Sequence, residues 1–348
     1  MNLQRTLSAG ALALVATSVS AQSDVQLFGL VDMMLYRRQL AAQPYHSSRL
    51  DSGGLNTSYW GVRGREDLGG GLSAHFELTS FFRADTGQIG RSDTDPFYAR
   101  SSWVGLQADW GGVQMGRQTT LGFTNMVRYS AFGGSSSFNP SFLQNYLASA
   151  TQPLMTGSGA ADSAWNNATS YTSPNVGGLS GSVYYAPSES TSAGNRTGAS
   201  LNFTRGAFSA GLVNEKISGM DLNFSIPPAV VRMQESQVWN LGASYDFEVV
   251  KLFAQAIKTK LRNATTHIDL DTVNIGASVL VGSGRFLISH GETTKSQTRQ
   301  ADLKRQTTSV AYDYLLSKRT DLYAVMMHDA LTGASNANGF AIGMRHRF

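Results

Sequence analysis

The carboxyl-terminal decapeptide, GFAIGMRHRF, alternates between two kinds of residue. Phe340, Ile342, Met344, His346 and Phe348 share one side of an extended strand, and the residues between them are glycine, alanine or arginine. A period of two over about ten residues suits a tilted strand that crosses a bilayer. In a soluble sheet the apolar face would meet a core, whereas in a membrane barrel it would meet lipid and the other face a wet lumen. One strand does not distinguish a soluble sheet from a membrane barrel, so the distinction must come from the rest of the chain.

The first residues, MNLQRTLSAGALALVATSVSAQ, have the pattern of a secretory signal peptide. Arg5 precedes a short apolar run, and the small residues Val19 and Ala21 fit a cleavage site after Ala21. A transmembrane anchor helix is disfavoured because the apolar run is short and no stop-transfer charges follow it. We therefore predict a signal peptide at residues 1–21 and a single exported domain at residues 22–348.

The composition excludes several classes of protein. The chain contains no cysteine, which excludes disulfide frameworks, thiolate metal sites and a cysteine nucleophile. Charged residues make up 15% of the chain, against roughly 25% in an average soluble domain, and glycine is abundant at 36 residues. No segment beyond the leader approaches about 18 consecutive apolar residues, so helical membrane spans are not expected. The net charge is only +4 with no long basic run, so we expect no nucleic-acid partner.

Strand-like segments of about ten residues recur along the chain, separated alternately by short and long connections. Tight turns rich in glycine and in aspartate or asparagine are expected at residues 67–71, 109–112, 175–178, 205–206, 246–249, 282–284 and 316–319. Long polar loops are expected at residues 37–56, 186–196, 217–234, 294–304 and 329–338. The pattern predicts an all-β fold, a transmembrane antiparallel β-barrel of about 16 strands with short turns at one rim. A β-sandwich gives no reason for such asymmetry between its two ends.

One stretch, residues 119–161, lacks clean alternation and is rich in glycine, serine, asparagine, phenylalanine and leucine. A loop of this length inside a compact domain is usually functional. A barrel of about 16 strands is too wide for wall side chains alone to fill. We therefore predict that this segment folds into the lumen and narrows it.

Several stretches resemble the general porins of Gram-negative outer membranes, most closely those of the beta-proteobacterial type. They cover the chain almost end to end, and EDLGGGL, the SKRT turn and the terminal HRF are the most specific of them. The matching stretches are LFGLVD (27–32), WGVRGREDLGGGL (60–72), FELTSFFRADTG (76–87), WVGLQADWGGVQMGRQ (103–118), SYTSPNVGGLSGSVYY (170–185), YLLSKRTDLYA (314–324) and GMRHRF (343–348).

The resemblance implies a 16-stranded, homotrimeric barrel whose third extracellular loop folds inward as a constriction. It implies passive diffusion of small hydrophilic solutes and ions across the outer membrane, with a mild preference for anions and no enzymatic activity or cofactor. The implied partners are outer-membrane lipid, lipopolysaccharide, the solutes, and the outer-membrane assembly machinery, which reads a terminal aromatic residue such as Phe348.

The chain departs from the porin pattern at the predicted constriction. Tyr59 and Ala164 stand where the resemblance leads us to expect arginine, whereas Arg100 and Arg117 match. Porin inward loops offer acidic residues opposite a basic wall, but no Asp or Glu occurs between residues 110 and 161. The strong transverse field of such a pore is therefore not expected. The segment supplies aromatic residues instead, namely Phe123, Tyr129, Phe132, Phe138, Phe142 and Tyr146.

Pore selectivity depends on fixed charge and on the width of the narrowest section. Strand parity places Tyr59, Arg63 and Arg65 on the lumen side of residues 57–66, with Trp60 and Val62 outside. We predict a pore-lining set of Arg38, Tyr59, Arg63, Arg83, Arg100 and Arg117, with Arg128 on the inward loop. Parity groups Arg100 with Val104 and Arg117 with Met115, so both assignments require a bulge or apolar residues in the lumen. The alternative for each arginine is a rim residue that binds lipopolysaccharide phosphates, or an ion pair with Glu66, Glu77 or Asp67.

Other functions remain as alternatives. The loop aromatics could pack the loop against the wall or line a track for solutes, which would make the barrel a channel that prefers aromatic, carboxylate or neutral solutes. A barrel enzyme or an adhesin is less favoured, because the sequence has no tandem-repeat loops, no HExxH or other metal spacing and no G-x-S-x-G elbow. His75 and Glu77 share a strand face, which fits a lumen electrostatic pair better than a catalytic one. We expect no catalytic residue and no metal.

Overall fold

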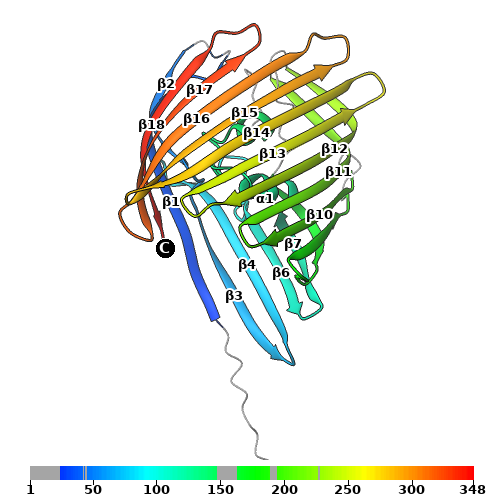
Figure 1. The fold of residues 1–348 in the computed structure, drawn as a ribbon. Coiled ribbons are helices and arrows are strands. Elements are labelled where there is room, and N and C mark those ends of the chain that lie inside the picture. Colours follow the sequence, from blue (N-terminus) through cyan, green and yellow to red (C-terminus); the bar gives the residue numbers. More distant parts are fainter. Residues whose placement is uncertain (1–23, 42, 44, 147–162, 189–193, 226–227) are drawn as a thin grey trace, which may run out of the picture.

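The computed structural model describes residues 24–348 apart from 42, 44, 147–162, 189–193 and 226–227 (Figure 1). The predicted signal peptide, residues 1–21, lies outside the described residues. None of the helices in the described part of the chain is long and apolar enough to span a membrane. The described residues form strands almost throughout, with two short helices between β7 and β8.

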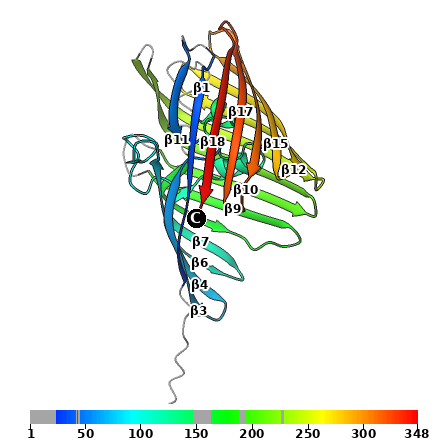
Figure 2. The same cartoon turned by 90° about the vertical axis from the view of Figure 1, so that its left-hand side faces the viewer.

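The strands all belong to one antiparallel arrangement that closes on itself. Each wall strand pairs with the next along the chain, and β18 pairs with β1 from Leu30 opposite Arg347 to Arg38 opposite Gly339 (Figures 1 and 2). The strands are β1 (Asp24–Arg38), β2 (Ser47–Ser52), β3 (Tyr59–Gly69), β4 (Leu72–Arg83), β5 (Gln88–Ile89), β6 (Ser101–Ala108), β7 (Gly111–Thr119), β8 (Ala164–Thr172), β9 (Leu179–Ala186), β10 (Arg196–Arg205), β11 (Phe208–Ser225), β12 (Pro228–Asp246), β13 (Val250–Arg262), β14 (His267–Val281), β15 (Gly284–Gln297), β16 (Leu303–Leu315), β17 (Thr320–Leu331) and β18 (Ala337–Arg347).

Two of these strands, β2 and β5, do not count as separate strands of the barrel wall. β2 and β3 both pair with β1, one after the other, and make a single wall strand interrupted at residues 53–58. The two-residue β5 pairs only with β4, in the connection before β6. The eighteen described strands therefore give a barrel of sixteen wall strands, which confirms the predicted fold class.

The alternation predicted from the last strand is present in the structure. On β18, Phe340 and Met344 expose 48% and 52% of their surface, whereas Ala341 and Arg345 are buried. The buried side faces the interior, because buried residues of the neighbouring β16 and β17 pack there with Phe132 and Phe138 of the segment between β7 and β8. The apolar side therefore faces outward, as an outer-membrane barrel requires.

The connections differ between the two rims as expected. All seven predicted tight turns join paired strands, for example at residues 282–283 between β14 and β15. The other rim differs from the prediction in two places. Within the predicted loop 37–56, residues Ser47–Ser52 form β2, which pairs with β1, and residues 217–234 are mostly strand and not loop. β11 and β12 stay paired as far as Ser225 opposite Pro228. The hairpin's backbone hydrogen bonds continue past the point where the alternation of its sequence weakens, and Ile217, Met220 and Met233 are buried in one apolar cluster at its base.

Two helices lie inside the ring of strands: α1 (Leu121–Arg128) and α2 (Pro140–Asn145) (Figure 1). Thr120 caps α1 by accepting a hydrogen bond from the backbone N–H of Phe123, and Asn139 caps α2 through Ser141. Pro140 occupies the first turn of α2, where its missing N–H costs nothing. Residues 119–146, called the inward segment below, therefore fall within the predicted loop 119–161, whose residues 147–161 lie outside the described part.

Candidate functional site

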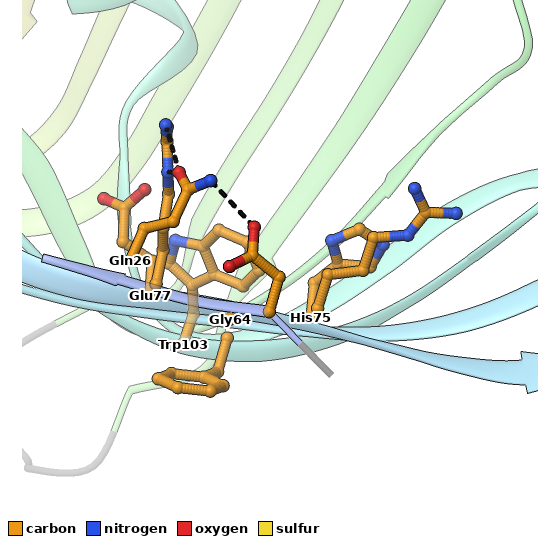
Figure 3. A pocket seen from close by; sticks show the side chains of 9 residues that line it. Gln26, Gly64, His75, Glu77 and Trp103 are labelled. Carbon is orange, nitrogen blue, oxygen red and sulfur yellow. Dashed lines mark hydrogen bonds between the residues drawn. The ribbon is translucent and has the colours of Figure 1, made fainter. Parts of the chain in front are cut away.

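One lumen-facing surface combines cations, aromatic rings and open space. Gln26, Arg63, Glu77 and Trp103 lie opposite one another on β1, β3, β4 and β6. Gln26 shares a strand face with Met34, which packs under the inward segment, so this row faces the lumen. Figure 3 shows Gln26, Glu77 and Trp103 on the same side of the sheet. With the neighbouring row of Asp24, Arg65 and His75 they line an open pocket of about 370 Å³.

Arg63 is held in place by its neighbours. Its Nη2 and Nε donate to Oε1 of Gln26 at 3.0 and 3.2 Å, and its guanidinium carbon lies 4.8 Å from the ring centroid of Phe28. Arg65 lies one row away, opposite Asp24 and His75, and its side chain forms no hydrogen bond or ion pair with any residue that the structure describes. A planar cation stacked on a ring keeps N–H groups at its edge for solutes.

Arg100 belongs to the same surface although its parity on the strand predicted otherwise. It lies one residue before β6, so the alternation of that strand does not fix its side chain. Its guanidinium carbon lies 4.2 Å from the ring centroid of Tyr59, and Nη1 is 3.3 Å from Oε1 of Glu77. The same carboxylate oxygen accepts a hydrogen bond of 2.7 Å from Thr79. Tyr59 itself meets Phe28 edge to face at 6.2 Å between centroids.

These residues form what we call the open wall. Its members face the lumen from β1, β3, β4 and β6 or stand directly before β6: Asp24, Gln26, Phe28, Tyr59, Arg63, Arg65, His75, Glu77, Arg100 and Trp103. Among them the three arginines outnumber the two acids, and Arg100 already compensates Glu77. The open wall therefore carries a small excess of positive charge.

Two other arginines of the predicted set, Arg38 and Arg83, lie near the long-loop rim, and Arg128 lies inside the barrel toward the tight-turn rim. Arg38 donates 2.9 Å from Nη1 to the carbonyl of Ser137 and so ties β1 to the inward segment. Arg83 ends β4 and pairs with Asp93 at 2.6 Å within the connection before β6. Arg128 ends α1 and donates from Nη1 to Oδ1 of Asn202 at 3.1 Å. The structure does not gather these three with Arg63 and Arg100.

Arg117 lies on the other face of the sheet. It is opposite Ser102 and shares a strand face with the exposed Met115, whereas the alternate residue Gln118 is buried. A bulge does occur here, but it adds its extra residue to β8, between Gly116 and Gln118 in the register of β7. Arg117 donates to the carbonyl of Ala99 at 2.7 Å and to Asn166 at 2.5 Å. We leave it out of the pore-lining set proposed below.

Besides the contacts of Arg38, Arg128 and one acid on β11, the inward segment is bound to the barrel by neutral polar groups. Asn125 donates to Oδ1 of Asn240 at 2.9 Å, and Gln255 donates to the carbonyl of Met126 at 2.8 Å. Gln144 donates to Thr307 at 2.9 Å. We call the lumen-facing side of β11–β18 that makes these contacts the packed wall.

Glycine allows the inward segment to approach the packed wall closely. A Cβ at Gly242 would lie 2.2 Å from the ring of Tyr129, and one at Gly291 would lie 2.6 Å from Pro140. Such distances are below any real Cβ contact. Tyr129 is fully buried by this fit and also pairs its hydroxyl with Ser209 at 2.9 Å.

The six aromatic residues of the predicted loop divide into two groups. Tyr129, Phe132 and Phe138 are buried and pack the segment against the wall. Phe123, Phe142 and Tyr146 are half-buried and touch one another, with ring centroids 5.5 to 5.8 Å apart. Both uses expected from the sequence, packing and a surface of rings, are thus compatible with the structure.

A second inward excursion was not predicted. The carboxylate of Asp32 accepts hydrogen bonds from the backbone N–H of Gly54 at 3.1 Å and of Asn56 at 2.7 Å, and one of 2.5 Å from the hydroxyl of Tyr323. This folds residues 53–58 into the barrel, where Ser135 of the inward segment donates to the carbonyl of Gly54 at 2.6 Å. The Gly53–Gly54 pair within a polar stretch was the available signal.

Ion pairs fill the barrel beside this excursion. Arg345 bonds to Asp321 at 3.0 Å and to Asp313 at 3.2 Å, and its Nη1 donates to Asn56. All three charged residues are buried, and Arg285 and Arg347 complete the group at 2.8 and 2.7 Å. Ala164, the other departure from the porin pattern, is buried and pairs with Thr119.

No cluster of three or more metal-ligating side chains occurs in the described part of the chain. His75 is hydrogen-bonded to Ser73 at 2.8 Å and lies next to Glu77 on β4, but its cross-strand neighbour is Arg65. The geometry is that of a charged channel wall.

Comparisons with known proteins agree with this geometry. A family profile described as Gram-negative porin matches residues 8–334. Outer membrane porin protein 32 of Delftia acidovorans is 28% identical, with 99% of this chain and 100% of that protein covered. An outer membrane porin protein of Bordetella pertussis is 26% identical over the same shares.

Solved structures share the fold. An anion-selective porin from Comamonas acidovorans has a TM-score of 0.78 at 26% identity, covering 94% of this chain and 100% of that one. A trimer form of OmpT from Vibrio cholerae has a TM-score of 0.68 at 13% identity, covering 94% of this chain and 99% of that one.

Proposed function

The chain belongs to the Gram-negative porin family, and from that premise we propose that it conducts small hydrophilic solutes and ions with a mild preference for anions, through a lumen narrowed by the inward segment. It is an outer-membrane porin channel and not an enzyme. The observation that carries the anion preference is the open wall, whose three arginines outnumber its two acids. The anion selectivity of the Comamonas porin supports the same direction.

We propose Tyr59, Arg63, Arg65 and Arg100 as the pore-lining residues of the open wall. Fixed cations in a water-filled pore raise the local concentration of anions and lower that of cations. Because Glu77 offsets Arg100 and the inward segment carries no acid, the field across the lumen is weak. We place Arg38 and Arg83 at the long-loop entrance and Arg128 deeper in the lumen, and each of the three already has a partner.

The test is the reversal potential of the purified channel in a salt gradient across a planar bilayer. The double substitution Arg63→Glu plus Arg100→Glu should lower the anion/cation permeability ratio or invert it. The matched control is Lys318→Glu, which reverses one charge in the exposed turn between β16 and β17. An unchanged reversal potential in the double variant would show that the open wall does not set selectivity.

A second candidate is a channel that prefers aromatic carboxylates or neutral solutes. Trp103 presents an indole in the same pocket as Arg63 and Arg65, and the half-buried rings of the inward segment add apolar surface. Block of the current by a micromolar aromatic acid, lost in Trp103→Ala, would favour this candidate. Near-linear current with little discrimination between solutes supports simple diffusion.

The remaining expected partners belong to this proposal. We propose a homotrimer in the outer membrane, in contact with lipid and lipopolysaccharide, after removal of residues 1–21. Phe348 pairs its backbone with Gly29 of β1 at 3.1 Å in both directions, which leaves the terminal ring on the barrel seam. We propose that the assembly machinery reads this residue before the seam closes.

A further inference from the structure

We propose that Glu215 is a positioning residue of the channel: its negative charge holds the first turn of α1, so that the passage narrowed by the inward segment depends on whether this carboxylate carries a proton. The inference rests on the proposed function, in which the inward segment sets the width. Glu215 would then control the width of the passage, whereas the arginines of the open wall affect only its charge.

Glu215 lies on β11 directly beneath the start of α1. It is opposite Gly198 on β10 and Val238 on β12, and only 8% of its surface is exposed. Its Oε1 accepts a hydrogen bond of 2.9 Å from the backbone N–H of Gly122. The first backbone N–H groups of a helix have no partner within the helix and carry its partial positive charge. A carboxylate at this point therefore binds α1 more strongly than a neutral group would.

The glycine at position 122 leaves room for the carboxylate of Glu215. A Cβ at Gly122 would lie 2.6 Å from Oε2 of Glu215, so only glycine lets the acid reach the helix without a shift. The same point would lie 3.4 Å from the hydroxyl of Tyr146, the residue that ends α2. Burial and then the charge of Glu215 raise the pKa of Tyr146 well above its ordinary value, so this tyrosine stays neutral. Glu215 is thus placed where the start of α1 and the end of α2 meet.

No cation in the described part of the chain forms an ion pair with this acid. Glu215 forms no ion pair with any residue that the structure describes, unlike the buried Asp313, Asp321 and Asp329. α1 has no acidic residue in its first turn, and its only charge, Arg128, is at the opposite end. The other titratable groups facing it are Tyr146 after α2, Tyr184 on β9 and, one row further along β10, Arg196, which has its own interactions.

Protonation of Glu215 would therefore weaken the attachment of α1 directly. The neutral acid keeps its shape but loses the charge-assisted part of the bond to Gly122 and the attraction to the helix end. Elsewhere α1 is held by neutral amides such as Asn240 and Gln255, which do not titrate in this range. We expect the population of a displaced inward segment to rise roughly tenfold when Glu215 becomes neutral.

The experiment is single-channel recording of the full-length protein in planar bilayers from about pH 8 to about pH 4, the range in which carboxyl groups titrate. The wild-type channel should show a second conductance level whose occupancy rises on acidification. Glu215→Gln should show that level at every pH, with no further dependence on acid. The control is Asp271→Asn, which removes a carboxylate that pairs with Lys258 on the outer face.

Gly122→Ala is the second variant, because its Cβ would displace the carboxylate while leaving the acid present. It should raise the same conductance level at high pH, so the inference stays testable if Glu215→Gln does not fold. A wild-type pH profile in Glu215→Gln, in a channel that still conducts and keeps its ion selectivity, would overturn the role of Glu215 alone. A reversal potential unmoved by the Arg63 and Arg100 double variant would instead overturn the proposed function.

Discussion

The open wall and the packed wall face the same lumen and are built by the same alternation, yet they use polar residues in opposite ways. On the open wall Arg63 and Arg100 stack on rings and keep contact with water. On the packed wall Arg345 and Asp321 are buried and satisfy each other. A polar inner face in a barrel therefore does not by itself identify a pore surface. The face lines the pore only where no other part of the chain covers it.

The two walls also differ in how much stability the protein loses when a charged side chain is removed. A buried charge whose partner is removed stays desolvated and uncompensated, which destabilises a protein by several kcal/mol. Replacing an exposed cation on a solvated wall changes the free energy of unfolding only a little. The comparison therefore predicts that stability depends on the packed wall and selectivity on the open wall.

The largest effect should come from breaking the buried ion group. Arg345→Met leaves Asp321 and Asp313 with fewer partners in the interior, and we expect a loss of about 3–5 kcal/mol in the free energy of unfolding. Urea unfolding followed by tryptophan fluorescence measures this. The matched change on the open wall, Arg63→Met, should cost less than about 1 kcal/mol. Equal losses in the two variants would remove the distinction between the walls.

The next effect concerns the fit of the inward segment. Gly242→Ala places a Cβ 2.2 Å from the ring of Tyr129, so we expect a loss of about 1–3 kcal/mol and a displaced segment that widens the passage. Single-channel conductance should rise. Gly181→Ala, whose Cβ would meet only a carbonyl oxygen at 3.3 Å, is the control. A Gly242→Ala channel of unchanged conductance would mean that Tyr129 does not position the segment.

A smaller effect is expected where Tyr59 holds Arg100. Tyr59→Ala removes a cation–π contact worth about 0.5–2 kcal/mol and lets the guanidinium move away from the lumen surface. The anion/cation permeability ratio from reversal potentials should fall modestly while the unfolding free energy hardly changes. Tyr245→Ala, on the outer face, should leave the ratio as it is. The stacking has no role in selectivity if both variants behave alike.

The smallest effect belongs to the connection before β6, which lies outside both walls. Burial opposes ionisation of Asp95, but the hydrogen bonds and charge of Arg91 hold its pKa below the usual range. Its contribution to stability is therefore present above the ordinary carboxyl pKa and is lost as pH falls through the lowered one. Asp95→Asn should cost about 0.2–1 kcal/mol locally at neutral pH.

Hydrogen exchange of the Arg91 amide, which donates to Asp95 at 2.7 Å, should report this loss. The wild-type exchange rate should approach that of the variant in acid, after correction for intrinsic exchange. A difference between the two that persists unchanged at low pH would contradict the pKa argument.

The barrel could be predicted because its determinants are local. Alternation such as that of Phe340 to Phe348 and the glycine-rich turns report strand faces and strand ends without reference to distant residues. The long hairpin at residues 217–234 escaped prediction because its sequence alternates only weakly, although Ile217, Met220 and Met233 pack together at its base. Its pairing depends on the partner strand, which a period in one strand does not show.

The site was predicted less completely, for reasons that individual residues show. The register of β3 and β4 puts Arg63 on the side that parity predicted, whereas parity does not apply to Arg100, which lies before the first residue of β6. The face on which Arg117 lies depends on which of the two strands contains the extra residue of the bulge, and the sequence does not show this. The roles of Asp32 and Glu215 depend on backbone N–H groups that approach from other parts of the chain, and no single-strand pattern reports such contacts.

The seam between β1 and β18 has a consequence for how the protein comes into being. Leu30 pairs with Arg347 and Gly29 with Phe348, so one edge of the earliest wall strand has no neighbour until the ribosome has made the last residues. Such long sequence separation slows folding and leaves an unpaired edge exposed in the meantime. Closure of the barrel is therefore the last pairing that this topology allows, because it needs the final strand of the chain.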